Sequence, residues 1–425
     1  MERRERLKYA KPTKVRILEY LYTVSSIPRK QLKLAFQDVA YNTVFRATKE
    51  LLDSGYIELL YGIKRTNQNQ DYKSWHGLSS NKRCSYASDI PKQVTHSSKK
   101  ERIERVQKTI DMCVASGIKT SQTSNISFSI FSQKEQDEDT VIEFSNLFVD
   151  EAVFFRADEI TKTIKAENTF GEEITQTQSR VTGLIINKNG LWFVYHSLDK
   201  LMKFTKQIEL TFTEAVIRFM ESSWLVQQYP NFFGFLSAKP KAIIIGNTPS
   251  MLPKIFTGRK WGETESDNKQ KQKIAAQMGS YENLKFIYSS IEFVPNNDCG
   301  RNYLHRTVYM TQAEMLDMCK TWATKFDYDC VAANGMFQLI HTGTSTRVAI
   351  LLTLNFDMLI HIRNLPEGTS IIIDKVMAEA VSRVLGASLV SAYDFNLNKL
   401  TPHKYNNNGI RCDGINPLTK KGHLE

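Results

Sequence analysis

The chain has 425 residues, of which 41% are hydrophobic and 24% are charged, as is usual for two or three globular domains. No stretch reaches the roughly 18–20 apolar residues that a membrane helix requires. The first residues, MERRERLKYAKPTK, lack the apolar segment of a secretory signal. We therefore expect a cytoplasmic protein with no membrane partner.

Positive charge is concentrated in the first quarter of the chain. Residues 1–110 hold 23 lysine and arginine residues against 11 aspartate and glutamate residues, a net charge of +12, whereas residues 111–425 sum to −1. This asymmetry indicates a basic module that binds a polyanion, joined to a neutral body with another task. A basic surface that serves solubility alone is the alternative interpretation.

Two short helices are predicted at the start of the chain. Pro12 and Thr13 occupy starting positions for the first, whose apolar residues recur at helical spacing: Val15, Leu18, Leu21 and Tyr22. The second is predicted to begin at Pro28, because the fixed φ and missing N–H of proline suit a first helical turn. Its apolar side comprises Leu32, Leu34 and Phe36.

A third helix is predicted from Tyr41 to about residue 53. Its core-facing residues follow the spacing i, i+4 and i+7: Val44, Thr48 and Leu51. Gly55 follows at the position where a residue in the left-handed conformation commonly ends a helix. Residues 56–63 and 72–79 then read as two strands of a hairpin with a polar tip.

Three short helices followed by a hairpin resemble the winged helix-turn-helix family of DNA-binding domains, over about residues 10–80. The most specific part of the resemblance is the third helix followed by LLDSGYIEL, residues 51–59. The family implies double-stranded DNA as the partner, with the third helix in the major groove. The residues that it implies as DNA contacts are Arg29, Lys30, Tyr41, Asn42, Thr43, Arg46, Lys49, Lys64, Arg65 and Lys73.

The resemblance also implies a role for each group of contacts. Asn42 would read adenine and Arg46 guanine, because both side chains offer bidentate geometry. The other three residues of the helix, Tyr41, Thr43 and Lys49, would contact phosphates or a thymine methyl group. The cations of the second helix would meet the DNA backbone, and those on or beside the wing would reach an adjacent groove. A small helical module that binds proteins is the alternative.

The rest of the chain predicts a linker and a larger domain. Residues 81–119 read as a polar linker and a connecting helix, which could pair with its own copy in a homodimer or pack on the second domain. Residues 120–425 alternate strands with helices and show no internal repeat. The predicted fold class is therefore α+β or α/β, with an N-terminal winged helix-turn-helix domain followed by a larger mixed-sheet α/β domain.

Several elements of the larger domain are predicted individually. Residues 181–197 read as a hairpin around NKNG, and residues 241–246 as a strand buried on both faces. Another strand is predicted within residues 283–294, and two strands within residues 346–364. Thr311 and Glu314 form the pattern of a capping box at the start of a helix. Residues 369–374 and 375–386 read as a strand and a helix.

Signals for catalysis are sparse. There is no P-loop motif, and the six cysteines lie far apart with no C-x-x-C pair, so we expect no cofactor, no metal site and free buried thiols. A metal-dependent nuclease would need converging carboxylates. The candidates are Asp158, Glu159 and Asp374, and the clearest hairpin contains no acidic residue.

The whole architecture also resembles the replication-relaxation proteins of mobile elements, which join a winged helix to a restriction-endonuclease-like domain. We expect a non-enzymatic, sequence-specific DNA-binding protein, acting as a regulator or as a DNA-binding accessory protein of a plasmid, phage or transposable element. One alternative is a metal-dependent nuclease or strand-processing enzyme targeted by the winged helix. Another is a protein-interaction scaffold.

Overall fold

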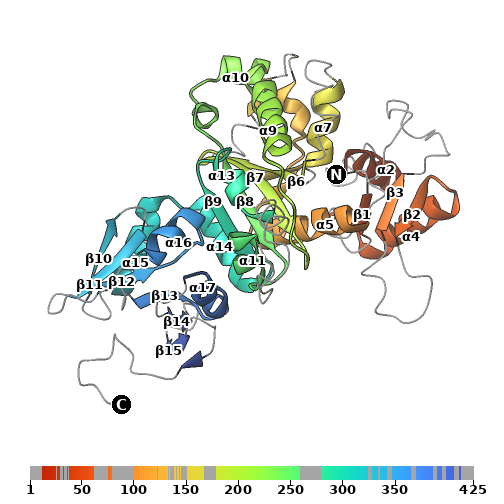
Figure 1. The fold of residues 1–425 in the computed structure, drawn as a ribbon. Coiled ribbons are helices and arrows are strands. Elements are labelled where there is room, and N and C mark those ends of the chain that lie inside the picture. Colours follow the sequence, from red (N-terminus) through yellow and green to blue (C-terminus); the bar gives the residue numbers. More distant parts are fainter. Residues whose placement is uncertain are drawn as a thin grey trace, which may run out of the picture.

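The described residues form three β-sheets of three, six and seven strands. Figure 1 shows the three-stranded sheet at one end, the six-stranded sheet in the middle and the seven-stranded sheet at the other end. This computed structural model describes residues 12–61 and 100–144, both with short gaps, and residues 75–78, 151–166, 179–258, 279–323, 328–333, 336–341, 347–364, 370–385, 390–394, 399–405 and 411–412. No helix in these ranges is long and apolar enough to cross a membrane.

In its described residues, the N-terminal unit contains two helices and a small antiparallel sheet with the strand order β1-β3-β2. Its elements are α2 (Thr13–Val24), β1 (Ser26–Pro28), α4 (Tyr41–Asp53), β2 (Ile57–Tyr61) and β3 (Trp75–Leu78). Its core is formed by Ile17, Leu18, Leu21, Leu32, Phe36, Val44, Ala47, Leu51 and Ile57. The first and third predicted helices and both strands of the hairpin are therefore present.

Pro28 does not have the role predicted for it. It ends β1 and pairs with Trp75 of β3, instead of starting a helix. Proline has no N–H to donate, which suits an edge strand, and β1 lies at the edge of the sheet. Beyond β1, the described residues include a helical hydrogen bond in which the N–H of Phe36 donates to the carbonyl of Leu32 at 3.2 Å.

Helix α4 ends as its sequence predicts. Gly55 has φ of 71°, and its N–H donates to the carbonyl of Leu52 at 3.0 Å. The N–H of Tyr56 donates to the carbonyl of Leu51 at 2.9 Å. These two bonds form a Schellman motif, which satisfies carbonyls that have no partner within the helix. The motif fixes the C-terminal half of α4 against the core, because Leu51 is 1% exposed.

The middle of the molecule is a six-stranded sheet with the order β4-β5-β6-β7-β8-β9. Helix α5 packs on β6 and β7 of this sheet, which is one of the two arrangements predicted for the connecting helix. The elements are α5 (Lys100–Ala115), β4 (Lys119–Thr120), the 3₁₀ helix η2 (Phe128–Phe131), β5 (Val153–Arg156), α7 (Ala157–Ala166), β6 (Val181–Asn187), β7 (Gly190–Ser197), α9 (Lys206–Glu221), α10 (Trp224–Gln228), the 3₁₀ helix η3 (Gly234–Ser237), β8 (Lys241–Gly246), α11 (Met251–Thr257), α13 (Glu282–Lys285) and β9 (Ile291–Pro295).

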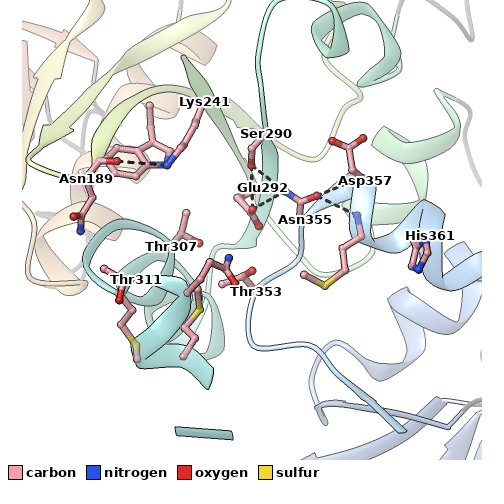
Figure 2. Close-up of a pocket in the computed structure, with 15 residues that line it drawn as sticks. Asn189, Lys241, Ser290, Glu292, Thr307, Thr311, Thr353, Asn355, Asp357 and His361 are labelled. Carbon is pink, nitrogen blue, oxygen red and sulfur yellow. Dashed lines mark hydrogen bonds between the residues drawn. The ribbon is translucent and has the colours of Figure 1, made fainter. Parts of the chain in front are cut away.

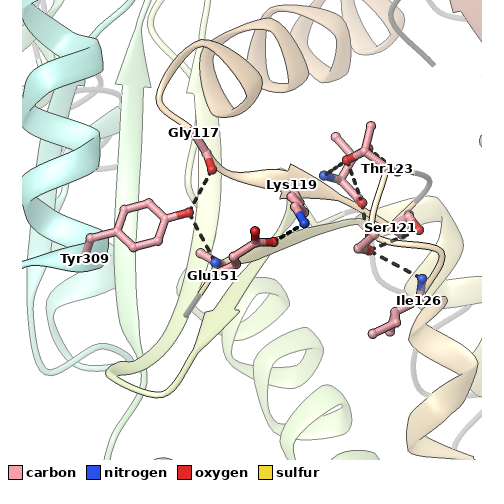
Figure 3. A network of polar contacts seen from close by, with 10 residues as sticks. Gly117, Lys119, Ser121, Thr123, Ile126, Glu151 and Tyr309 are labelled. Atoms are coloured by element: carbon pink, nitrogen blue, oxygen red, sulfur yellow. Dashed lines mark hydrogen bonds and ion pairs between the residues drawn. The ribbon is translucent and has the colours of Figure 1, made fainter. Parts of the chain in front are cut away.

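A polar network joins the edge of this sheet to a helix from much later in the chain (Figure 3). The hydroxyl of Tyr309 donates to the carbonyl of Gly117 at 2.9 Å and accepts from the N–H of Ala152 at 3.2 Å. Lys119 of β4 and Glu151 form an ion pair beside it. One phenol therefore satisfies two backbone groups where the short strand β4 joins the sheet.

The seven-stranded sheet runs from β10 to β16 in chain order. Its elements, with the helices beside it, are α14 (Asp298–Tyr309), α15 (Gln312–Ala323), β10 (Tyr328–Ala333), β11 (Met336–His341), β12 (Arg347–Ile350), α16 (Phe356–Arg363), β13 (Ser370–Asp374), α17 (Ala378–Leu385), β14 (Val390–Asp394), β15 (Lys399–Tyr405) and β16 (Arg411–Cys412). The predicted capping box is present, since Glu314 accepts from the N–H of Thr311 at 2.7 Å.

The two large sheets share one pattern of connection. In each, three antiparallel strands are followed by two strands parallel to the third: β5 to β9 in the first and β10 to β14 in the second. The helices after the two fourth strands, α11 and α17, pack against each other. The sequence showed no internal repeat, so the repetition is one of topology.

Two predicted strands are helical or displaced. The segment predicted as the second strand of residues 346–364 is helix α16, because the Asn355 side chain caps it by accepting from the N–H groups of Asp357 and Met358. Residues 283–294 begin with helix α13, and only their last part belongs to β9. The hairpin at 181–197 and the strand at 241–246 are confirmed as β6, β7 and β8.

Candidate functional site

Helix α4 separates a buried face from an exposed face. Val44, Ala47, Thr48 and Leu51 are buried. The residues predicted as DNA contacts on this helix are all exposed, namely Tyr41, Asn42, Thr43, Arg46 and Lys49. The prediction for Val44, Thr48 and Leu51 is therefore confirmed. Four of these exposed residues lie in the N-terminal half of the helix and Lys49 lies just past its middle, whereas the Schellman motif fixes the C-terminal end.

The cations of this unit differ in how they are paired. Lys14 forms an ion pair with Glu50, and Arg16 forms one with Asp38 at 2.7 Å. Hydrogen bonding to Arg16 lowers the pKa of Asp38. In contrast, the ion pairs of the described residues do not include Arg46 or Lys49. Both cations of α4 therefore remain available for an anionic partner.

An apolar residue also lies on the exposed face of α4, and the sequence analysis did not single it out. Phe45 is 37% exposed and its ring lies 6.3 Å from that of Tyr41, which is 45% exposed. The spacing of four residues places both rings on one side of the helix. An apolar residue at position i+1 from the buried Val44 is the signal in the sequence that could have identified it.

The remaining predicted contacts cannot be placed. Arg29, Lys30, Lys64, Arg65 and Lys73 lie outside the residues that the structure describes.

The three candidate nuclease carboxylates are not brought together. Asp158 and Glu159 lie at the start of α7 beside the six-stranded sheet, whereas Asp374 ends β13 in the seven-stranded sheet, and Figure 1 shows the two elements far apart. Asp158 accepts two hydrogen bonds from Arg156, both at 2.9 Å. Among the described residues, no three histidine, cysteine or acidic side chains form a group that could hold a metal ion.

Glu159 has a structural role. It is 3% exposed, and its two oxygens accept from the hydroxyl of Ser121 at 2.8 Å and from the N–H of Phe128 at 2.9 Å. Burial raises the pKa of Glu159 to about 7, although both hydrogen bonds act in the opposite direction. The carboxyl group thus joins α7 to η2 within the core.

A second buried titratable group lies under helix α5. His196 of β7 is fully buried, and its Nδ1 lies 3.1 Å from the hydroxyl of Thr109. Burial lowers the pKa of His196 to about 3, and the charges of Lys108 and Arg105 act in the same direction. His196 is therefore neutral at physiological pH and contributes to packing.

A cavity of about 600 Å³ lies where the two large sheets meet (Figure 2). One wall is formed by the first residues of β8 and β9, including Lys241 and Glu292. The other wall is formed by the end of α14, the start of α15 and the segment from β12 to α16. His361 is a half-buried residue of α16 in this lining.

Glu292 is 8% exposed and carries the main polar feature of this cavity. Its Oε1 accepts from the side chains of Asn355 at 2.8 Å and Ser290 at 3.3 Å. Its Oε2 is buried and has no hydrogen-bond partner among the described residues. Leaving such an acceptor unsatisfied costs about 1–3 kcal/mol, and more when the group is charged. Burial raises the pKa of Glu292, against the hydrogen bonds from Asn355 and Ser290.

No protein-family model, curated protein or solved structure matches the chain.

Proposed function

We propose that this protein binds double-stranded DNA in a sequence-specific manner through its N-terminal unit, with α4 in the major groove. The observation that carries the proposal is the two-sided character of α4. The C-terminal end of the helix is fixed in a core, and its exposed face carries Asn42, Arg46 and Lys49, whose side chains can bond to base edges and phosphates.

The connectivity of the unit supports a winged helix. A helix, a short strand, a helical turn, α4 and two further strands follow one another along the chain, and β1 pairs with the last strand of the three. A winged helix places its wing between the last two strands, which here are β2 and β3. The wing cations named above belong to that connection, which lies outside the described residues.

Charge supports the same partner. The net charge of +12 in residues 1–110 provides a sequence-independent attraction to phosphate, and the near-neutral remainder of the chain does not oppose it. We infer that specificity comes from α4, while the excess of lysine and arginine supplies non-specific affinity.

Selection of binding sites from a pool of random duplexes tests the proposal. The full-length protein should enrich a defined sequence, and its affinity should fall linearly with salt on a double logarithmic scale. Because each neutralised phosphate contributes a slope of about −0.9, four contacts predict roughly a hundredfold loss between about 50 and 200 mM salt.

A fragment ending near residue 100 should retain most of the DNA affinity of the full-length protein. Equal affinity from a fragment that starts near residue 120 would contradict the division between the two parts.

The exposed rings of α4 predict a preference for thymine. The apolar group that B-DNA offers in its major groove is the thymine methyl group, so Phe45 and Tyr41 would gain most there. Replacing the contacted thymine with uracil should weaken binding by the parent protein by about 0.8 kcal/mol, or roughly fourfold. The Phe45→Ala variant should bind the two duplexes equally. Equal sensitivity of both proteins to the substitution would exclude Phe45 as the reader.

The resemblance to replication-relaxation proteins suggests a biological setting for this binding. We propose a regulator or DNA-binding accessory protein of a mobile genetic element. The alternative function, a metal-dependent nuclease, gains no support from the three candidate carboxylates. Asp158 and Glu159 of α7 bond to Arg156 and Ser121, and Asp374 lies apart from them at the end of β13.

A further inference from the structure

Two side chains of opposite charge, Lys241 and Glu292, line the cavity between the two large sheets. Lys241 and Ser290 are aligned across β8 and β9, since their neighbours Ala242 and Ile291 pair in register. Ser290 immediately precedes β9 and its hydroxyl donates to Glu292 of that strand at 3.3 Å, so the two side chains lie on the same face of the sheet. Figure 2 shows Lys241 and Glu292 along one side of the cavity, with Thr307 opposite.

Hydrogen bonds hold the carboxyl group of Glu292 in position, but they involve only one of its two oxygens among the described residues. The side chain of Asn355 donates to Oε1 of Glu292 and also caps α16. Asn355 therefore joins the carboxyl group of β9 to the start of α16. The hydroxyl of Thr353 lies close enough to interact with the carboxyl group. Nevertheless, Oε2 has no hydrogen-bond partner in the described part of the chain, and neither has the buried hydroxyl of Thr307. An incoming N–H donor would satisfy Oε2.

The ammonium group of Lys241 also has weak contacts in the described residues. It lies 5.1 Å from the centre of the Trp192 ring and donates to the carbonyl of Asn189 over a long 3.5 Å. Burial lowers the pKa of Lys241, and the charge of Glu292 opposes that shift. The remaining N–H groups of Lys241 can donate to an anionic acceptor in the cavity.

The rest of the lining includes three flexible apolar side chains. Met310 follows α14, Met315 lies on α15 and Met358 on α16. Thioether side chains adapt to irregular apolar shapes. The cavity therefore combines the buried acceptor Glu292, the donor Lys241 and an adaptable apolar wall, beside further polar residues that include Thr307 and Asp357.

We propose that this cavity binds a small zwitterion, namely a free α-amino acid with an aliphatic or thioether side chain. The ammonium group of the ligand donates to Oε2 of Glu292, its carboxylate accepts from Lys241, and its side chain packs among the methionines. A ligand with both charges matches the pair, whereas a simple anion or a simple cation leaves one of the two protein charges without a partner.

Calorimetry and thermal unfolding of the full-length protein test the proposal. L-Leucine or L-methionine at about 10 mM should raise the unfolding temperature, because a ligand that binds only the folded state stabilises it. Two analogues keep the leucine side chain and lose one charge each: 4-methylpentanoate lacks the ammonium group and 3-methylbutylamine lacks the carboxylate. Each should bind at least about tenfold more weakly than leucine.

A matched pair of variants then tests the residue. Glu292→Gln should weaken amino-acid binding at least about tenfold. Glu214→Gln makes the same substitution at an exposed glutamate of α9, outside the lining, and should retain the affinity of the parent. The proposal is overturned if none of the common amino acids binds, if 4-methylpentanoate binds as tightly as leucine, or if folded Glu292→Gln retains the affinity of the parent. The analogue comparison uses the unmodified protein, so it holds even if Glu292→Gln does not fold.

Discussion

Replacing Arg46 with alanine should weaken binding to the preferred DNA site by about 1–3 kcal/mol and leave non-specific binding nearly intact. Arg46 is exposed on α4, on the side opposite the buried Val44, Thr48 and Leu51. It is also free of ion pairs to the described residues, unlike Arg16 of the same unit. Its guanidinium is therefore available to donate two hydrogen bonds to one guanine. Titration of the selected duplex and of a scrambled duplex measures the two affinities.

Arg218→Ala is the matched control, because Arg218 is an exposed arginine of α9 in the six-stranded part of the body. It removes the same charge and should leave both affinities unchanged. If Arg46→Ala binds the selected duplex as tightly as the parent does, α4 is not the reading helix. An equal loss on both duplexes would instead assign Arg46 to phosphate contact.

The sequence predicted α4 well because local rules determine most of its features. The buried positions follow helical periodicity, and Gly55 ends the helix in the conformation that glycine favours. The hairpin of β6 and β7 and the capping box of Thr311 and Glu314 are local in the same sense. These elements needed no knowledge of the surrounding fold.

Features that depend on tertiary packing could not be predicted in this way. The segment of α16 was predicted as a strand because FDMLIHI is mostly apolar and follows a break at Asn355, and the cap that Asn355 provides for a helix was overlooked. Pro28 is an edge-strand residue only because β3 returns beside it from residue 75. Periodicity also gave no indication that Lys241 and Glu292 would face one cavity, since their strands are almost 50 residues apart in the chain.

The candidate carboxylates show the same limit. Asp158 and Glu159 were considered together because they are adjacent in sequence, yet successive helical residues point in different directions. Asp158 contacts Arg156, while Glu159 enters the core and meets Ser121 and Phe128. The two acidic residues at the start of α7 are thus explained by an ion pair and by burial, without reference to a metal ion.

Glu159→Ala should destabilise the protein by about 3 kcal/mol at pH 5, because it leaves the Phe128 N–H and the Ser121 hydroxyl without their buried acceptor. The destabilisation should be smaller at pH 8. Burial raises the pKa of Glu159 to about 7 from an unfolded value of 4.5, so the folded parent retains a proton that the unfolded chain releases between these pH values. The parent therefore loses stability as pH rises through that window, and the variant, which lacks the group, does not. Denaturant unfolding at both pH values gives the two differences in free energy.

Glu214→Ala, at an exposed glutamate of α9, is the control and should change stability little at either pH. A destabilisation by Glu159→Ala that is equal at both pH values, or larger at pH 8, would show that Glu159 is ionised in the folded protein at pH 5.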